Sequence, residues 1–237
     1  MVITGNLVWQ RSISSSTETI ETSSMPNILI ADDHAIVRYG TTLIIKDLLP
    51  AVHVFEAENF SQVLKLLNQQ RFDLLILDIN IPGGNNLQMV DVVRLHQPQI
   101  RILIFSGYDE QLFALRYLQA GVDGYLVKHS PEEELKTAIR TVLNNEKYLS
   151  STIRQHLLNG LNTKSDISRN PLQTLSNREM EVMQLLIKGS SVADIGTLLS
   201  LQISTVSTYK ARIFDKLDVA NVIDLAEKVR LYSGKAL

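Results

Sequence analysis

The apolar positions in the first half of the chain follow two alternating patterns. Runs of consecutive apolar residues predict buried strands, and apolar residues spaced by three and four positions predict amphipathic helices. The strands are expected at residues 28–31, 52–57, 74–77, 100–105 and 124–127. The helices that follow them are expected at residues 36–49, 60–67, 87–95, 112–118 and 131–144.

Five strand–helix pairs in succession define the fold class that we expect for this half. Such a pattern is typical of an α/β protein with a parallel sheet, right-handed crossovers and helices on both faces. The doubly wound order 2-1-3-4-5 places the first and third of the five strands side by side. Polar residues that end these two strands would then meet at one edge of the sheet.

Single residues add detail to the predicted helices. The apolar pattern of the first helix includes Ile36 and Leu43, and that of the third includes Leu95. Ser130 is expected to cap the fifth helix, with Pro131 at its first position.

The strand pattern disappears beyond residue 171, and the remaining residues predict an all-α domain of four helices. Ser176 and Glu179 have the spacing of a capping box, and Ser191 is expected to cap the second helix. Ser204 is expected to cap a third helix over residues 205–217, before a fourth at about 222–232. Two short helices joined by a tight turn are typical of a helix-turn-helix motif.

Composition changes mark the rest of the domain organisation. Residues 1–24 are rich in Ser and Thr, and we expect a disordered tail with Met25 as an alternative natural start. Residues 25–145 form the first domain, 146–171 a linker with a short amphipathic helix, and 172–237 the second domain. Polar, turn-forming residues in the second half of 146–171 favour the linker assignment.

Charge and cysteine content exclude some classes of protein. The 237 residues carry a formal net charge of −2 and no cysteine, which excludes disulfides and thiolate zinc sites. We expect a cytoplasmic protein with no membrane contact, because no apolar stretch approaches the ~18–20 residues that span a bilayer and no signal peptide is evident.

Polar residues follow four of the predicted strands. Asp32 and Asp33 follow the first strand, Asp78 the third, Ser106 the fourth and Lys128 the fifth. In the expected strand order these side chains face one crevice at the carboxyl edge of the sheet, where ligands bind in open α/β sheets. The alternative, caps at the ends of an ordinary sheet, explains one such residue more readily than it explains all of them.

Three carboxylates in one small pocket repel one another and require a cation. With oxygen ligands and no His or Cys expected nearby, we expect Mg²⁺, held by Asp33, Asp78 and the backbone carbonyl of Asn80, with Asp32 acting through water. A carboxylate beside Mg²⁺ can attack a phosphoryl group and form an acyl phosphate. Lys128 offers a positive charge to the phosphoryl oxygens, and the Ser106 hydroxyl offers a hydrogen bond.

The segments "ILIADDH", "LLILDINIPGG", "ILIFSG" and "DGYLVK" resemble the receiver domain of bacterial two-component response regulators, which is flavodoxin-like. The resemblance covers about residues 26–145. It implies that a sensor histidine kinase phosphorylates Asp78, with Ser106 and Tyr125 as a switch pair. This chain departs from the usual pattern at Ile81, Asn86 and His129. None of these departures removes a group needed for phosphorylation.

The third helix of the second domain presents a candidate DNA-binding face. Small side chains such as Ser207, Thr208 and Ala211 can approach base edges, and Lys210 and Arg212 suit phosphates. The residues expected at this interface are Ser204, Thr205, Ser207, Thr208, Tyr209, Lys210, Ala211 and Arg212. The residues expected to pack inside the domain are Val206, Tyr209, Ile213 and Leu217. The alternative is an ordinary solvated helix face in a small bundle.

The segment "LSNREMEVMQLLIKG…STVSTYKARIFDKL" resembles the LuxR-type helix-turn-helix domain of NarL/FixJ-type regulators. The resemblance covers about residues 172–233. It implies a transcription regulator in which phosphorylation of Asp78 promotes homodimerisation and binding to promoter half-sites. RNA polymerase is a further candidate partner.

Three other functions are alternatives to this one. An aspartyl-phosphate phosphatase of the haloacid-dehalogenase type needs a second Asp two residues after the nucleophile, where this chain has Asn80. A dinucleotide-binding domain needs a glycine-rich turn after the first strand, which is missing. A receiver that works without phosphorylation, through partner binding, stays open.

Overall fold

The computed structural model describes residues 25–162 and 171–233. The strands are β1 (Asn27–Ala31), β2 (His53–Ala57), β3 (Leu74–Leu77), β4 (Arg101–Ser106) and β5 (Gly124–Val127). The first six helices are α1 (Ala35–Leu48), α2 (Phe60–Gln69), α3 (Leu87–His96), α4 (Glu110–Gln119), α5 (Glu132–Leu143) and α6 (Ser151–Asn162). Among these residues, no helix is long and apolar enough to cross a membrane.

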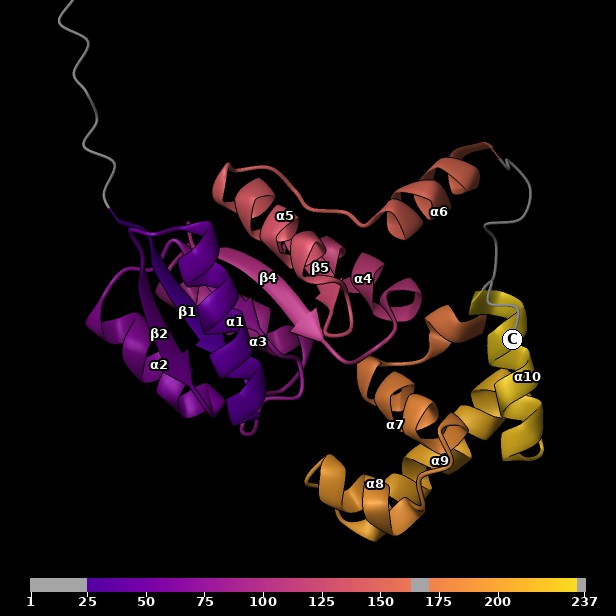
Figure 1. The fold of residues 1–237 in the computed structure, drawn as a ribbon. Coiled ribbons are helices and arrows are strands. Elements are labelled where there is room, and N and C mark those ends of the chain that lie inside the picture. Colours follow the sequence, from indigo (N-terminus) through magenta and orange to yellow (C-terminus); the bar gives the residue numbers. More distant parts are fainter. Residues whose placement is uncertain (1–24, 163–170, 234–237) are drawn as a thin grey trace, which may run out of the picture.

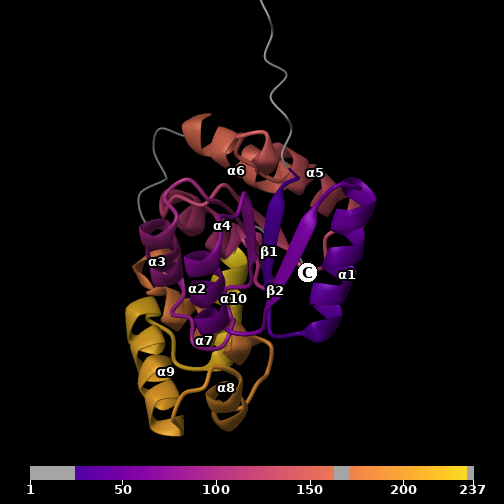
Figure 2. The same ribbon diagram turned by 90° about the vertical axis from the view of Figure 1, so that its left-hand side faces the viewer.

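The described strands form one parallel sheet in the order β2-β1-β3-β4-β5, as the sequence predicts. Two hydrophobic clusters cover its faces. Ile45 of α1 and the apolar face of α5 pack on one side, and α2, α3 and α4 pack on the other. Figures 1 and 2 show the sheet between these two layers of helices. β3 is buried along its whole length, because helices cover both of its faces.

The structure corrects several details of the predicted helices. Ile36, Leu43 and Leu95 are 77%, 51% and 81% exposed, whereas Ile45 and Phe113 are fully buried. The spacing of apolar residues therefore assigned Ile36 and Leu43 to the buried face of α1 wrongly. Apolar residues occupy more than one face of that helix, so spacing alone does not identify the buried one. The N-cap residue of α5 is Pro131 and not Ser130, so this helix begins at Glu132.

The second domain follows a 3₁₀ turn, η1 (Pro171–Thr174). Its described helices are α7 (Asn177–Ile187), α8 (Val192–Leu198), α9 (Ile203–Leu217) and α10 (Val222–Ser233). The predicted capping box of Ser176 and Glu179 is confirmed, and Ser191 forms a second one with Asp194. Ser204 is not a cap: α9 begins two residues earlier than predicted, and its N-cap is Gln202.

The turn between α8 and α9 depends on a glycine. A Cβ atom on Gly196 would lie 2.9 Å from the carbonyl oxygen of Leu201, closer than side chains tolerate. The Leu201 amide donates a 2.8 Å hydrogen bond to the Gly196 carbonyl, and Ser200 adopts a left-handed φ of 52°. The tight connection of the helix-turn-helix motif therefore requires a residue without a side chain at this position.

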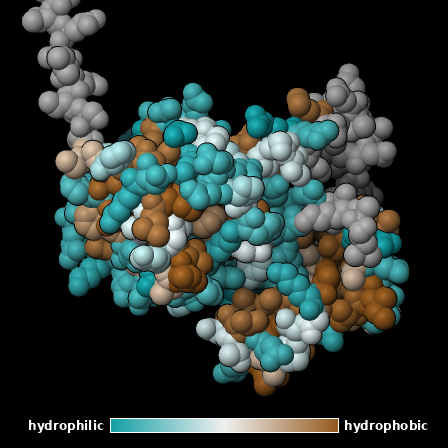
Figure 3. Space-filling model, viewed as in Figure 1, coloured by the Kyte–Doolittle hydropathy of each residue, from teal (hydrophilic) through white to brown (hydrophobic). Residues whose placement is uncertain are grey.

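The two domains meet through α4 and α7, which lie one above the other in Figure 1. Arg116 of α4 donates hydrogen bonds to the carbonyls of Leu175 and Leu172 and to Oδ1 of Asn177. The second domain also carries exposed apolar side chains, among them Leu198 and Ile203, and apolar surface gathers over this domain in Figure 3.

Candidate functional site

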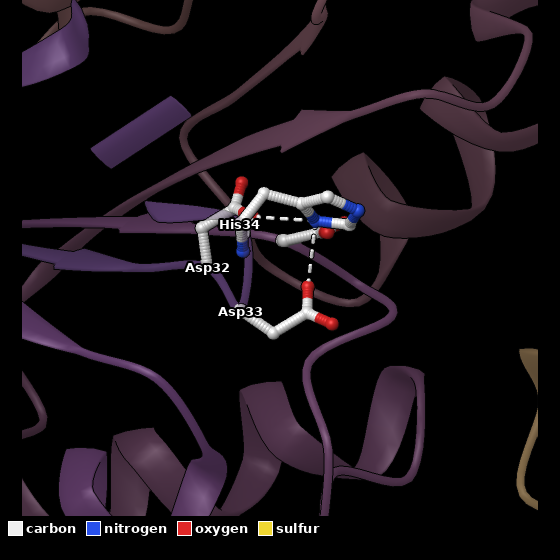
Figure 4. Close-up of side chains that lie close together, drawn as sticks. Asp32, Asp33 and His34 are labelled. Carbon is white, nitrogen blue, oxygen red and sulfur yellow. Dashed lines mark hydrogen bonds and ion pairs between the residues drawn. The ribbon is translucent and has the colours of Figure 1, made fainter. Parts of the chain in front are cut away.

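Three aspartates and a histidine form a cluster at the carboxyl edge of the sheet. β1 pairs with β3 so that Ala31 lies opposite Leu77, and the Asp78 amide donates a 2.8 Å hydrogen bond to the Ala31 carbonyl. This register brings the residues after both strands together. One ligand atom from each of Asp32, Asp33, His34 and Asp78 lies within 4.8 Å of the others. Figure 4 shows the first three.

The ammonium of Lys128 joins the two buried carboxylates of this cluster. Nζ lies 2.7 Å from Oδ2 of Asp78 and 2.6 Å from Oδ2 of Asp32. Burial raises the pKa of Asp78, although Lys128 opposes the shift. Burial lowers the pKa of Lys128, but the two carboxylates outweigh it and the pKa is raised overall. The lysine therefore stays charged, and it compensates the negative charge at the end of β3.

Ser106 and Tyr125 are both buried, beside the backbone of Tyr108. The Tyr108 amide donates to Oγ of Ser106 at 3.2 Å, and the Tyr125 hydroxyl donates to the Tyr108 carbonyl at 3.1 Å. Tyr125 is only 2% exposed, so its ring already points inward. Burial raises the pKa of this phenol, which stays protonated and acts as a donor.

Asn80 lies at the mouth of the cluster. Its backbone amide donates to Oδ1 of Asp78 at 3.2 Å, and its side-chain amide donates to the Tyr108 hydroxyl at 3.0 Å. Asn80 thus lies two residues after Asp78, whose carboxylate belongs to the acid cluster.

His34 also belongs to the cluster, contrary to the prediction that no histidine lies near the acids. Its Nδ1 lies 3.1 Å from Oδ1 of Asp32 and 2.8 Å from Oδ1 of Asp33, as Figure 4 shows. The donor set is nevertheless dominated by carboxylate oxygens, which suit a hard cation such as Mg²⁺. These residues could hold a divalent metal ion.

Arg38 was also missed, and it supports the loop that carries two of the aspartates. Its buried guanidinium donates to the carbonyl of Asp32 at 2.8 Å, to Glu56 at 3.0 Å and to Glu58 at 2.6 Å. Because the three acceptors belong to β2 and to the segments after β1 and β2, one side chain ties these segments together. The spacing of α1 alone gives no sign of this contact.

The cluster opens into a cavity of about 380 Å³ that both domains line. The first domain contributes Asp33, Asp78 and Lys128, and the second contributes Leu185, Lys188 and Leu198 among others. The second domain therefore forms part of the wall of the acid pocket.

The predicted DNA-binding face of α9 is open to solvent. Ser204, Ser207, Thr208, Ala211 and Arg212 are exposed. The residues Thr205, Tyr209 and Lys210 are partly exposed. The hydroxyls of Ser207 and Thr208 donate to carbonyls one turn back in the helix, and they can rotate outward to a ligand.

The opposite side of α9 packs as predicted. Val206, Ile213 and Leu217 are buried, whereas Tyr209 is only partly covered. The ammonium of Lys210 lies 5.4 Å from the centre of the Phe214 ring, which holds the lysine along the helix surface.

Comparison with known proteins shows the family of the chain. Residues 28–140 match the response regulator receiver domain, and residues 173–229 match the bacterial regulatory proteins of the luxR family. The oxygen regulatory protein NreC of Staphylococcus haemolyticus is 33% identical over 205 residues, which are 84% of this chain and 94% of that protein. The response regulator GacA of Pseudomonas aeruginosa is 32% identical over 203 residues, 85% and 94% of the two chains.

A solved structure of two RcsB dimers bound to two parallel DNAs is similar in fold, with a TM-score of 0.54 and 25% identity. It covers 86% of this chain and 98% of that one. The chain belongs to the two-component response regulators of the NarL/FixJ type, which join a receiver domain to a LuxR-type helix-turn-helix domain. It is a DNA-binding transcription regulator of that family, and the predicted fold class is confirmed.

Proposed function

We propose that phosphorylation of Asp78 by a sensor histidine kinase switches this regulator. The position of Asp78 carries the proposal: its carboxylate ends β3, is 4% exposed and lies 2.7 Å from the Lys128 ammonium. One carboxylate oxygen attacks the phosphorus of the donor, the bond from phosphorus to the leaving nitrogen breaks, and an acyl phosphate forms. Lys128 then compensates charge on the phosphoryl oxygens.

Mg²⁺ is the cofactor that this chemistry requires. Asp33, Asp78 and the backbone carbonyl of Asn80 would hold it, with Asp32 acting through water. The ion supplies charge compensation to the phosphoryl oxygens when it is bound. The carboxylate-rich cluster supports this assignment.

Ser106 and Tyr125 form the switch pair in this proposal. Ser106 shifts to donate a hydrogen bond to a phosphoryl oxygen, and Tyr125 occupies the space behind it. The contact that both residues make with Tyr108 supports the pairing. The change would bias the α4 face between two arrangements.

In the second domain, α9 enters the major groove through the residues Ser204, Thr205, Ser207, Thr208, Tyr209, Lys210, Ala211 and Arg212. We infer that two copies bind half-sites about one helical turn apart. The RcsB dimers on DNA support a dimer here as well. α10 offers a dimer surface in this proposal. The stripe of Val222, Leu225, Ala226 and Val229 that its spacing suggests does not supply it, because Leu225 and Val229 are buried in their own domain, whereas Ile223 and Leu231 are 73% and 76% exposed. RNA polymerase would be the next partner at a promoter.

We further propose that the chain is a cytoplasmic regulator, not an enzyme that turns over a substrate. Phosphatase chemistry of the haloacid-dehalogenase type would need a carboxylate in place of the Asn80 amide, which here donates to Tyr108.

The domain bounds 25–145, 146–171 and 172–237 remain part of this proposal, and the predicted tail 1–24 lies outside the described residues. The phosphorylation-independent mode is the second candidate.

Acetyl phosphate labelling tests the proposal. Asp78→Ala should abolish labelling and weaken promoter binding, whereas Asp91→Asn, an exposed acid on α3, should leave both unchanged. Undiminished labelling of Asp78→Ala would remove this residue from its role. Full labelling of the unaltered protein with no change in DNA affinity would favour the phosphorylation-independent mode.

A further inference from the structure

Lys188 lies at the end of α7, and the local sequence fixes its backbone there. The helix stops because Gly189 adopts a left-handed φ of 86°. The amides of Gly189 and Ser190 donate to the carbonyls of Leu186 and Leu185, both at 3.0 Å, which is typical of a helix that ends in glycine. Lys188 is therefore the C-cap residue, and its long side chain leaves the helix from a well-anchored position.

This end of α7 lies against the acid pocket of the receiver. Lys188 lines the cavity of about 380 Å³ whose wall also contains Asp78 and Lys128. It lines a second cavity of about 350 Å³ together with His129, the residue after Lys128. Because Gly107 and Lys188 belong to both cavities, the lysine lies where the two meet, beside the phosphoacceptor.

The charge of Lys188 is not engaged by another residue. Within the ranges 25–162 and 171–233, its side chain is exposed and forms no ion pair or hydrogen bond. The other lysine of the same cavity, Lys128, is held between Asp32 and Asp78 at 2.6 Å and 2.7 Å. The cavity wall therefore carries a cation that is committed to the acids and a cation that is available to a ligand.

Phosphorylation would leave the pocket with too little positive charge. The three carboxylates of the cluster are balanced by Lys128 and Mg²⁺, with the His34 imidazole neutral. Conversion of the Asp78 carboxylate into an acyl phosphate replaces one negative charge by roughly two. One more cation is needed to restore neutrality, and Lys188 lines the same cavity.

The walls that carry Lys188 favour such a contact. The second domain also contributes Leu185, Leu198 and Leu199 to the cavity. Apolar walls hold little water, and charges attract one another more strongly there than across open solvent. The cavity volume lies at the lower end of the range of about 300–1,000 Å³ that small-molecule sites occupy, which suits a phosphoryl group or a small acyl phosphate.

We propose that Lys188 is a phosphoryl-binding residue that the DNA-binding domain contributes to the receiver. Its ammonium contacts the phosphoryl oxygens of the group on Asp78, from the wall that the second domain supplies. The same contact binds the phosphoryl group of a small acyl phosphate before the transfer. The inference rests on the proposed phosphorylation of Asp78.

Two ligands of opposite charge separate this role from a structural one. Lys188 repels Mg²⁺ while the pocket is unphosphorylated, and it attracts the anion that binds afterwards. Lys188→Gln should therefore bind Mg²⁺ more tightly and bind beryllofluoride, an anionic mimic of the phosphoryl group, more weakly. Because the lysine is exposed, each dissociation constant should change by roughly two- to fivefold. A residue that only supports the fold would weaken both ligands when it is replaced.

The test uses the full chain. Isothermal titration calorimetry measures the Kd for Mg²⁺ alone, and fluorine NMR measures the Kd for beryllofluoride at saturating Mg²⁺. The rate of acetyl phosphate labelling at several donor concentrations separates KM from kcat, and the KM of Lys188→Gln should rise by roughly two- to fivefold. Lys65→Gln, an exposed lysine on α2 outside the cavity, should leave all three quantities unchanged.

The outcomes distinguish the inference from the function on which it rests. An unaltered Kd for beryllofluoride in Lys188→Gln would overturn the inference and leave the proposed function intact. Absence of labelling in the unaltered chain would refute the proposed function and the inference with it.

A chemical rescue keeps the test decisive if Lys188→Gln disturbs the fold. The chain has no cysteine, so the thiolate of Lys188→Cys can displace bromide from bromoethylamine or iodide from iodoacetate at this position alone. The first product carries an ammonium at nearly the length of lysine, and the second carries a carboxylate. The ammonium should restore the affinity for beryllofluoride, and the carboxylate should weaken it further. Equal affinities before and after both treatments would overturn the inference, and Lys65→Cys treated in the same way is the control.

Discussion

Nζ of Lys128 lies 2.7 Å from Oδ2 of Asp78, so the end of β5 supplies the cation that offsets the acid at the end of β3. The two residues are 50 positions apart in the chain. Only the parallel order of β3, β4 and β5 brings them into contact. The sheet thus assembles the reactive centre from residues that have no local relationship.

Removal of the Lys128 charge should slow phosphorylation. In Lys128→Gln the phosphoryl oxygens lose a cation, and the rate of acetyl phosphate labelling should fall by roughly a hundredfold, as for the loss of a preorganised donor in other sites. Lys65→Gln, an exposed lysine on α2, should label at the normal rate. Equal rates in the two variants would show that Lys128 is not needed for the transfer.

The buried acid should make the receiver less stable at neutral pH. Because burial raises the folded-state pKa of Asp78, its ionised form is disfavoured in the folded protein. With Mg²⁺ chelated, Asp78→Asn should therefore melt a few degrees higher than the unaltered protein at pH 7. Acidification protonates folded Asp78 before the unfolded chain, so the difference should shrink as the pH falls through the raised pKa. Calorimetry at several pH values measures the two melting temperatures. A difference between them that widens at low pH would contradict this prediction.

Arg38 should affect both the Mg²⁺ concentration needed for labelling and the free energy of unfolding. Arg38→Gln removes the donor to the Asp32 carbonyl and the partner of Glu56 and Glu58. We expect a loss of about 1–3 kcal/mol in the free energy of unfolding and a higher Mg²⁺ concentration for half-maximal labelling. Lys46→Gln, an exposed residue of the same helix, should change neither. A stability loss with an unaltered Mg²⁺ requirement would reduce Arg38 to a structural contact.

Two neighbouring residues of α9 should affect DNA binding in different ways. Thr208→Ala removes a hydroxyl that the proposed function assigns to base contacts, so discrimination against mutated half-sites should fall by about 1–3 kcal/mol. Arg212→Gln removes a charge that the proposed function assigns to a phosphate contact, so binding should weaken on all sequences and the salt slope should fall by about 1. Fluorescence anisotropy at several salt concentrations measures both quantities. Equal effects on every sequence from Thr208→Ala would exclude it from base recognition.

The tight turn before α9 gives a prediction for the second domain alone. Gly196→Ala forces a methyl group against the Leu201 carbonyl, and overpacking of this kind costs about 1–3 kcal/mol. Chemical denaturation should show the loss in the second domain. Gly40→Ala, where an added Cβ meets nothing within 4 Å, is the control. Equal stability of both variants would show that the α8–α9 connection can shift to make room.

The residues that the sequence predicted well are those with a local cause. Continuous apolar runs located β1, β3, β4 and β5, and the polar residue at or just after the end of each strand lies at the same edge of the sheet. The capping box of Ser176 and Glu179 is likewise readable from its spacing. These features depend on neighbours in the chain, which a single sequence displays.

The features that escaped prediction depend on contacts between distant segments. Arg38 acts only because β1 and β2 end beside α1, and His34 joins the acids only through the orientation of its ring. From the sequence alone, Glu181 would be expected on the solvent-facing surface of its helix. Its burial follows from the docking of a second domain, which no periodicity in α7 reports.

Direct identification of the phosphorylated residue tests the central claim. The full chain is treated with acetyl phosphate and Mg²⁺, and the acyl phosphate is reduced with borohydride to homoserine, which tandem mass spectrometry locates in the sequence. We predict homoserine at position 78 and at no other aspartate position. Homoserine at Asp32 or Asp33, or an unmodified position 78 in protein that carries phosphate, would contradict it.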